Sequence, residues 1–435
     1  MLAFGAVAAQ ASGPDPPKRS WPRRHPLLTV LAAVLVVLVV LAGALVGKLR
    51  LDQAQTAARQ RALAAFYDVP RSSLAGAPGS VIRTEGVDFA PGGSRGWRVL
   101  FRSQDAAGRP TVSSGMVFAP AGTPPPGGRP VLAWAHGTVG MGDACAPSRQ
   151  QDPLSELRPF LDAALREGWV VTAPDYAGLG TAGVEAYLVG ATEARDVLNS
   201  VRAARNMAGV GAGSTVVIWG HSQGGQSSLF AAALAGSYAP ELRLLADGAD
   251  APAAELVPLL GQQYDTAIAW AIGALVAVAW PISYAGLPLD RVLSPVALRT
   301  YQATAQLCIL DAAVRGLVRN DLLRQRFFQV DPASVPAWRP VLDANTVPLP
   351  PPGLPLFVAQ GEADQVVLPN TTALLVQRYC QAGVPLETFW DPGASHSQIA
   401  SDGGPRFMAW LADRLAGKPA PSSCGRPLPV APASV

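Results

Sequence analysis

The sequence has little charge and almost no lysine. Charged residues make up 15% of the 435 residues, against about 25% in an average globular protein, which excludes a disordered tail, a coiled coil and a halophilic surface. The only lysines are Lys18, Lys48 and Lys418. Because the body of the chain has no basic stretch interleaved with aromatic residues, nucleic-acid binding is not expected.

The sequence also lacks the patterns of several other protein classes. It has no internal repeat at solenoid or propeller spacing. It has no G-X-Y period despite 43 glycines and 41 prolines, so collagen is excluded. There is no CxxC motif and no Cys/His pair at ligand spacing, so no metal site is expected. Its four cysteines predict two disulfides in an exported domain, with three possible pairings; they are Cys145, Cys308, Cys380 and Cys424.

One long apolar run is present near the N-terminus. Leu27–Val46 carries no charge, and as a helix its ~20 residues are long enough to cross a ~30 Å hydrocarbon core. More basic residues precede the run than follow it, which places the N-terminus in the cytoplasm and the rest of the chain outside. The preceding residues are Lys18, Arg19, Arg23 and Arg24; the following ones are Lys48 and Arg50.

Three interpretations of this run are open. We favour a signal anchor that stays in the membrane, because the run is longer than the apolar part of most signal peptides. A cleaved signal peptide is the alternative, since Ala42-Gly43-Ala44 resembles a cleavage site. Arg23-Arg24 also permits a twin-arginine signal. The predicted location is therefore a membrane-anchored extracytoplasmic domain, or a secreted domain if the leader is cleaved.

The rest of the chain has the pattern of an α/β fold. Three early segments alternate in polarity and predict antiparallel strands: Val81–Arg83, Trp97–Phe101 and Val112–Phe118. Continuous apolar strands then alternate with helices. The predicted strands are Val131–Ala135, Trp169–Ala173, Val216–Trp219, Leu242–Ala246, Leu354–Ala359 and Leu386–Trp390. The predicted helices are Leu154–Glu167, Ala191–Met207, Gln223–Leu234, Asn370–Ala382 and Arg406–Leu415. This alternation predicts a mostly parallel sheet covered by helices on both faces.

The alternation is interrupted once, where a helical cap is expected. Within it Ala267–Trp280 is a mostly apolar run too short to span a membrane comfortably, so a buried or interfacial helix is predicted. The predicted organisation is a basic cytoplasmic leader (1–26), a transmembrane segment (27–46), a helical stalk (47–66), a first core part (67–250), the cap (251–349), a second core part (350–416) and a proline-rich tail (417–435).

The clearest chemical motif is Gly220-His221-Ser222-Gln223-Gly224, between a predicted strand and a predicted helix. In a nucleophile elbow a strand turns sharply into a helix and exposes a serine hydroxyl at the turn. Glycines two residues before and after the serine are needed because side chains there would collide with the neighbouring strand and helix. Ser222 is therefore the predicted nucleophile.

A serine nucleophile needs a histidine base, and the chain has four histidines. His25 precedes the apolar run. His221 is adjacent to the serine, with its side chain directed away from the hydroxyl. His136 ends a predicted strand, and the loop that follows is expected to supply an oxyanion N–H group instead. His396, in the predicted loop Asp391–His396, is therefore the predicted base.

The base in turn needs a carboxylate that holds its tautomer and stabilises the imidazolium. Asp364 follows a predicted strand and gives the chain order Ser222, Asp364, His396, which is that of an α/β-hydrolase. Glu362 and Asp391 are the alternatives. Glu362 lies closer to the strand, and Asp391 is so near the histidine in sequence that it reaches the ring with difficulty.

An acyl-transfer site also needs two backbone N–H groups where negative charge develops. The N–H of Gln223 is the first predicted donor. The second is expected from Gly137 or Thr138, in the loop after the first buried strand, because glycine there lets the backbone approach closely. Asp175–Gly180 ends the next strand at the same edge and either shapes the pocket or forms a plain turn.

Several segments, taken in order, resemble the secretory lipase family, the bacterial and fungal α/β-hydrolases similar to fungal lipase A. They are Phe66–Pro70, Pro78–Arg83, Ala135–Thr138, Cys145–Ser148, Pro174–Gly180 and Gly220–Gly224. The resemblance covers about Phe66–Leu415 and implies hydrolysis of carboxylic esters, including acylglycerols, with a helical cap between the elbow and the acid. It also implies the disulfides Cys145–Cys308 and Cys380–Cys424. The N-terminus departs from the family, whose members are typically secreted through a cleaved signal.

The sequence thus predicts a serine ester hydrolase, a lipase or esterase, that needs no metal or organic cofactor. Its expected partners are a lipid-like acyl ester and the membrane. The apolar segment Ala267–Trp280 favours a lipid-like substrate, because burying an acyl chain contributes ~0.8 kcal/mol per CH₂. Two alternatives are an acyltransferase that uses the same three side chains and a catalytically inactive hydrolase-fold protein that binds ligands at the cell surface.

Overall fold

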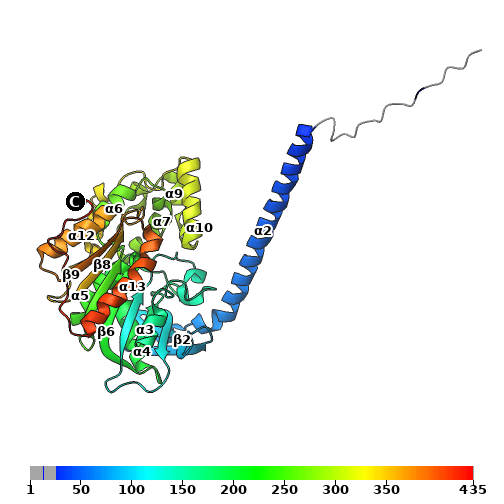
Figure 1. Cartoon of the computed structure of the whole chain (residues 1–435). Coiled ribbons are helices and arrows are strands. Elements are labelled where there is room, and N and C mark those ends of the chain that lie inside the picture. The colour runs from blue at the N-terminus through cyan, green and yellow to red at the C-terminus, as the bar shows by residue number, and fades with distance from the viewer. Residues whose placement is uncertain (1–12, 14–25, 435) are drawn as a thin grey trace, which may run out of the picture. The chain divides into compact units, whose positions relative to one another are not determined.

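The computed structural model describes Gly13 and residues 26–434 (Figure 1). The basic leader lies outside the described residues, and with it the predicted roles of Lys18, Arg19, Arg23, Arg24 and His25. The chain divides into two compact units, residues 1–59 and 60–435.

The described part of the first unit belongs to helix α2 (Pro26–Tyr67), which continues into the second unit and is blue in Figure 1. Among the described residues, α2 is the one helix that is long and apolar enough to cross a membrane. The predicted stalk is not a separate helix but the continuation of α2. The reason is local: Leu51–Ala65 contains no proline or glycine and is rich in Ala, Gln and Arg, all good helix formers.

The described residues form a nine-stranded sheet in the order β1-β2-β3-β5-β4-β6-β7-β8-β9. Neighbouring strands from β1 to β5 along this order pair antiparallel, and all later neighbours pair parallel. The sheet is therefore mixed and mostly parallel. The strands are β1 (Val81–Val87), β2 (Ser94–Gln104), β3 (Pro110–Pro120), β4 (Arg129–Ala135), β5 (Val170–Pro174), β6 (Ala212–His221), β7 (Arg243–Asp250), β8 (Leu356–Gly361) and β9 (Leu386–Asp391).

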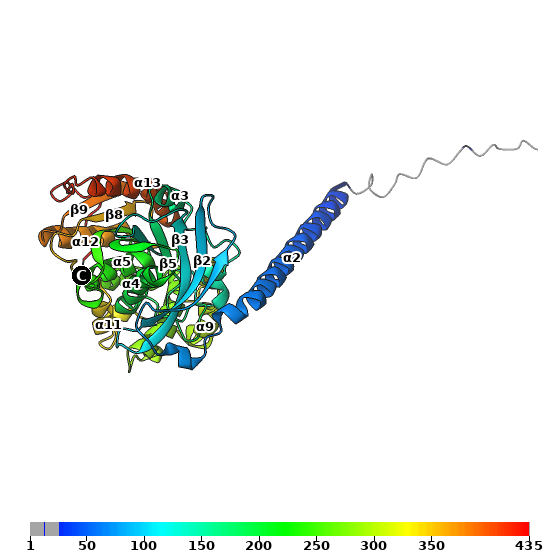
Figure 2. The same ribbon diagram turned by 90° about the horizontal axis from the view of Figure 1, so that it is seen from below.

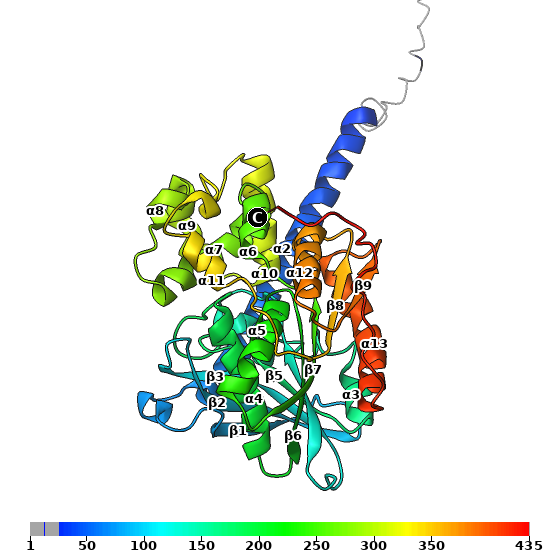
Figure 3. The same cartoon turned by 90° about the vertical axis from the view of Figure 1, so that its left-hand side faces the viewer.

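Helices cover both faces of the sheet (Figures 2 and 3). One face carries α3 (Leu161–Arg166) and α13 (His396–Leu415). The other carries α4 (Gly190–Asn206), α5 (Gln223–Tyr238) and α12 (Pro369–Gln381). Side chains along a strand point alternately to the two faces. In β4, Leu132 and Trp134 accordingly join the core under α13, whereas the residues that alternate with them join the core under α4 and α5.

A run of helices lies between β7 and β8 in the chain and gathers at one end of the sheet (Figures 1 and 3). We call α6–α11 the inserted helices. They are α6 (Leu256–Gln263), α7 (Ile268–Ser283), α8 (Leu289–Val292), α9 (Pro295–Ala305), α10 (Ile309–Leu317) and α11 (Arg339–Ala344). The apolar run Ala267–Trp280 forms most of α7 and is largely buried. The disulfides are Cys145–Cys308, which joins the inserted helices to the core, and Cys380–Cys424, the two pairs that the family resemblance implies.

Two helices begin several residues away from the predicted start. The predicted helix Leu154–Glu167 is shortened to α3, because Pro159 lacks an N–H and disfavours helical geometry in the residue before it. The predicted helix Arg406–Leu415 begins earlier, at His396, and contains Pro405. The glycines before this proline let α13 lie against the sheet: a Cβ on Gly403 would stand 2.8 Å from the Asp250 carboxylate, and one on Gly404 would stand 3.1 Å from the Trp219 ring.

Candidate active site

Ser222 lies at the sharp turn between β6 and α5. Its backbone has φ +60° and ψ −116°, a conformation that is rare and strained for a residue other than glycine. The flanking glycines explain how the turn is possible. A Cβ on Gly220 would collide with the Gly224 backbone, and one on Gly224 would collide with the Ala135 carbonyl. The motif therefore has the geometry that the sequence predicts for an elbow.

The structure brings Ser222, His396 and Asp364 together in a chain of hydrogen bonds. The Ser222 Oγ lies 2.9 Å from His396 Nε2, and His396 Nδ1 lies 2.7 Å from Asp364 Oδ2. His396 is the first residue of α13, not a loop residue, and Ser395 caps the helix through a capping box with Gln398. The imidazole is therefore fixed by the start of a helix as well as by the carboxylate.

Asp364 is buried and held by several donors. Its Oδ1 accepts hydrogen bonds from the amides of Val366 (2.8 Å) and Val367 (3.0 Å), and its Oδ2 accepts one from Gln360 Nε2 (3.2 Å). The rival Asp391 accepts instead from the Gly393 amide within its own turn. Asp364 is thus the carboxylate that contacts His396.

The other described histidines have different roles. His221 donates from Nε2 to the carbonyl of His396 (2.9 Å), and the two rings lie 4.6 Å apart between centroids. Loss of hydration, with a smaller contribution from His396, lowers the pKa of His221 to about 3, so this ring stays neutral in the ordinary pH range. His136 is buried, with Nδ1 2.6 Å from the Gly137 carbonyl and Nε2 3.2 Å from the Asp175 carbonyl.

The three predicted oxyanion donors lie near the serine but are not equivalent. Gln223 begins α5, so its N–H has no acceptor within the helix. The Gly137 N–H points elsewhere, because it donates to Glu156 Oε2 at 3.3 Å. Thr138 lines the same cavity as Ser222 and Gln223, and its hydroxyl lies 2.8 Å from Tyr187 Oη. The geometry therefore favours Thr138 over Gly137 as the second donor.

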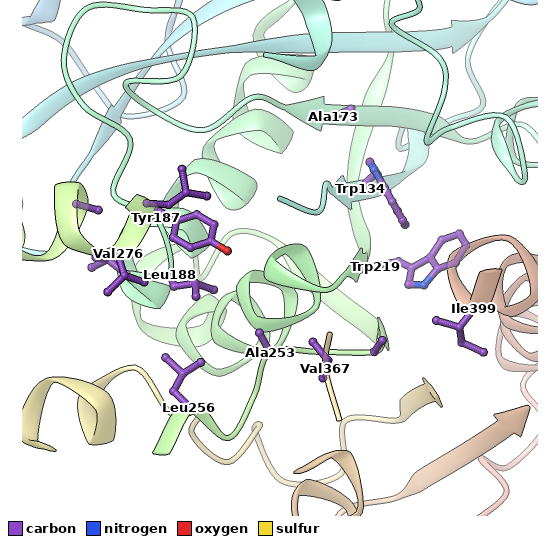
Figure 4. Close-up of a cluster of buried hydrophobic side chains, with 14 of the residues drawn as sticks. Trp134, Ala173, Tyr187, Leu188, Trp219, Ala253, Leu256, Val276, Val367 and Ile399 are labelled. Atoms are coloured by element: carbon purple, nitrogen blue, oxygen red, sulfur yellow. The ribbon is translucent and has the colours of Figure 1, made fainter. Parts of the chain in front are cut away.

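Ser222 opens onto a largely apolar cavity between the core and the inserted helices. The space measures about 630 Å³, part of it open to solvent. Its apolar lining includes Leu188, Ala253, Leu256, Leu259, Leu260, Ile268, Ile272, Val276, Trp280, Leu342, Val366 and Val367. Figure 4 shows Leu188 and Tyr187 close to Val276 of α7.

The cavity wall is formed by a segment other than Asp175–Gly180, the one that the sequence suggests. Tyr187 and Leu188 line it, whereas Asp175 is buried in a network with the hydroxyls of Ser114 and Ser148. Sequence reasoning also missed two buried glutamates, Glu185 and Glu193, whose carboxyl groups accept hydrogen bonds from the side chain of Gln223. The signal for them was weak, because acidic residues in and before a helix usually face solvent.

The described residues contain no group of three or more His, Cys, Asp or Glu side chains that could hold a metal ion. The arrangement can instead act through its own side chains. A hydroxyl bonded to an imidazole, itself bonded to a buried carboxylate, can attack an acyl carbon while the imidazole takes the proton.

Comparisons with known proteins identify the family of the chain. The family model described as "Secretory lipase" matches residues 157–423, more than half of the chain. Lipase A of Arthroderma benhamiae is 27% identical over 370 residues, which cover 80% of this chain and 75% of that protein. A "probable inactive lipase" of Mycobacterium tuberculosis is 28% identical over 375 residues, covering 81% of this chain and 82% of that protein.

Solved structures show the same fold. Lipase A of Candida antarctica superposes with a TM-score of 0.68 at 19% identity, covering 84% of this chain and 88% of that one. The rice cell wall degrading esterase LipA of Xanthomonas oryzae gives a TM-score of 0.62 at 19% identity, covering 79% of this chain and all of that one. The fold is therefore that of lipase A.

Proposed function

The chain belongs to the secretory lipase family, and from that membership and the geometry of its site we propose that it is a serine carboxylic-ester hydrolase acting on acylglycerols or other lipid-like esters. The observation that carries the proposal is the hydrogen-bonded series Ser222, His396, Asp364 at the end of an apolar cavity. No metal or organic cofactor takes part in the proposed reaction.

In the first half of the reaction His396 Nε2 takes the proton of the Ser222 hydroxyl as its Oγ attacks the acyl carbon. Asp364 holds the Nδ1–H tautomer and stabilises the imidazolium that forms. The N–H groups of Gln223 and Thr138 stabilise the oxyanion of the tetrahedral intermediate. The imidazolium then protonates the leaving alcohol, and the acyl group remains on Ser222.

In the second half water replaces the alcohol. His396 takes a proton from the attacking water, the second tetrahedral intermediate uses the same N–H donors, and the proton returns to Ser222 Oγ as the carboxylic acid leaves. The acyl chain occupies the cavity under α6 and α7, where each buried CH₂ contributes ~0.8 kcal/mol. The apolar lining therefore supports a lipid-like acyl group.

A relative named a probable inactive lipase makes an inactive binding protein the alternative to test. The unbroken contacts from Ser222 to Asp364 favour an active enzyme. The test is hydrolysis of p-nitrophenyl esters from acetyl to palmitoyl by the full chain, beside Ser222→Ala. We expect activity that Ser222→Ala abolishes; a wild-type chain that hydrolyses none of the esters would refute the proposal.

We further propose that Leu27–Val46 of α2 anchors the protein in a membrane with residues 60–435 outside the cytoplasm. The length and apolar character of α2 support this topology, and two disulfides suit an oxidising compartment. Intact-mass analysis of protein from membranes tests it. A mature N-terminus near Ala44 in the soluble fraction would instead indicate a cleaved leader and a secreted enzyme.

A further inference from the structure

Three buried polar side chains meet beside the serine turn and take no part in the proton transfers. Gln223, Glu185 and Glu193 are each at most 2% exposed. The side-chain nitrogen of Gln223 donates to Glu185 Oε1 at 2.8 Å and to Glu193 Oε1 at 2.7 Å. Because an amide nitrogen carries two hydrogens, both are used, and the Gln223 side chain is fixed between the two carboxyl groups.

Glu193 also holds the wall of the cavity. Its Oε1 accepts the N–H of Leu188 at 2.8 Å, and its Oε2 accepts the hydroxyl of Ser227 at 2.6 Å. Leu188 has φ +53°, which is uncommon for a residue other than glycine, so its conformation depends on such contacts. One carboxyl group therefore connects the cavity wall to the first turn of α5, where the proposed oxyanion donor lies.

The two carboxyl groups cannot both carry a charge at low cost. They bind the same nitrogen, and the titratable groups that face them are Asp196 on α4, Tyr176 and Tyr187, none of them basic. Burial raises the pKa of Glu193 to about 7 and that of Glu185 well above its ordinary value. Three accepted hydrogen bonds favour the charged form of Glu193, whereas the charge of Glu193 raises the pKa of Glu185 further and favours its protonated form.

We propose that Glu193 is a positioning residue that orients the Gln223 backbone and the Leu188 wall of the cavity together, and that Glu185 is its protonated partner. This inference rests on the proposed ester hydrolysis. It predicts that the rate falls at alkaline pH, because a second negative charge drives the carboxyl groups apart and frees the side chain of Gln223.

The experiment compares Glu193→Gln and Glu185→Gln in the full chain on p-nitrophenyl butyrate. In Glu193→Gln a single amide oxygen replaces the two carboxylate oxygens that accept from three donors. We expect kcat to fall about tenfold with KM little changed. This loss is smaller than the roughly 10²–10³-fold fall in kcat when an oxyanion donor is removed completely. In Glu185→Gln we expect a smaller loss at neutral pH, and the alkaline decline of the rate should disappear. Wild-type kcat and an unchanged pH profile in both variants would overturn the proposal.

Glu255→Gln is the matched control. Glu255 is also a buried glutamate, but its carboxylate accepts hydrogen bonds from Arg378 at 2.8 and 3.0 Å and not from Gln223 or Leu188. Its replacement should lower the melting temperature and leave kcat and the pH profile unchanged. A pH profile altered as much as in Glu185→Gln would show a general effect of buried carboxyl groups and would contradict a specific role.

A second measurement separates this inference from the proposed function. The infrared band of a protonated carboxyl group should be weaker at neutral pH in Glu185→Gln than in the wild type. An unchanged band would refute the protonation of Glu185, whether or not the protein hydrolyses esters. A lost band together with a wild-type chain inactive on every ester would support the carboxyl pair and refute the hydrolase.

Discussion

The carboxyl edge of the sheet and the inserted helices contribute different things to the site. The sheet edge supplies Ser222, Asp364 and His396, which follow β6, β8 and β9. Pairing between neighbouring parallel strands fixes these positions. The inserted helices supply most of the apolar cavity wall and none of the three reacting side chains. Under the proposed function, substitutions in these two parts should therefore separate the chemistry from acyl-chain selection.

The inserted helices are joined to the core at separate points and not by strand pairing. The Cys145–Cys308 disulfide is one. Gln263 Nε2 donates to the Gln365 carbonyl at 2.7 Å, and Trp280 Nε1 donates to the Tyr187 carbonyl at 3.1 Å. Substitutions at the sheet edge should thus affect every substrate, whereas those in the inserted helices should affect substrates according to chain length.

Replacement of the serine should have the largest effect. Ser222→Ala removes the nucleophile, and we expect hydrolysis of all esters to fall by about 10⁶-fold. Ser228→Ala is the control, because Ser228 is a buried serine of α5, the helix that follows Ser222, and its hydroxyl donates to the Gly225 and Gly248 carbonyls. Steady-state assays with short and long esters measure both. Residual activity of Ser222→Ala close to that of Ser228→Ala would contradict the assignment.

Replacement of the Asp364 carboxylate should have the second largest effect on activity. Asp364→Asn keeps the shape but no longer selects the Nδ1–H tautomer of His396, so kcat should fall about 10⁴-fold for every chain length. Asp391→Asn, at the carboxylate that accepts from the Gly393 amide, should change kcat little. If Asp391→Asn proved the more damaging variant, the acid would be misassigned.

A bulky residue in the cavity should discriminate between substrates. Ile272 lines the cavity from α7, and Ile272→Trp should lower kcat/KM for palmitoyl esters about 200-fold if four methylenes lose ~0.8 kcal/mol each. Acetyl esters should be hydrolysed as before. Ile282→Trp, at an exposed position of the same helix, is the control. Equal losses for acetyl and palmitoyl esters would mean that the cavity does not hold the acyl chain.

The smallest expected effect is the difference in stability between variants that lack one or the other disulfide. Their cysteines are 163 and 44 residues apart, so by loop-closure entropy Cys145→Ser/Cys308→Ser should lose about 1 kcal/mol more free energy of unfolding than Cys380→Ser/Cys424→Ser. Denaturant unfolding monitored by tryptophan fluorescence measures the difference. A greater loss without the shorter-range disulfide would show that strain or residual structure outweighs chain entropy.

The sequence predicted the sheet edge well because its signals are local. Each strand is a short apolar run, and the elbow needs glycines at fixed offsets from Ser222. The start of α13 was missed because Gly403, Gly404 and Pro405 suggest a helix boundary. In the structure they lie inside the helix, where the two glycines permit close contact with the sheet.

Features that depend on distant contacts could not be predicted. Gly137 and Thr138 are equivalent donors in the sequence; the contact of the Gly137 N–H with Glu156 and the place of Thr138 in the cavity lining distinguish them. The carboxyl group of Glu193 similarly resembles that of any helix surface residue until the fold buries it against Gln223. Burial of polar groups is decided by tertiary packing and not by local periodicity.

Labelling with a fluorophosphonate tests the central claim most directly, because the reagent reacts with an activated serine whatever the acyl preference. Peptide mass spectrometry of the labelled full chain should locate the phosphonyl group on Ser222, and His396→Ala should react far more slowly. A label on another residue, or equal labelling rates of the wild type and His396→Ala, would contradict activation of Ser222 by His396.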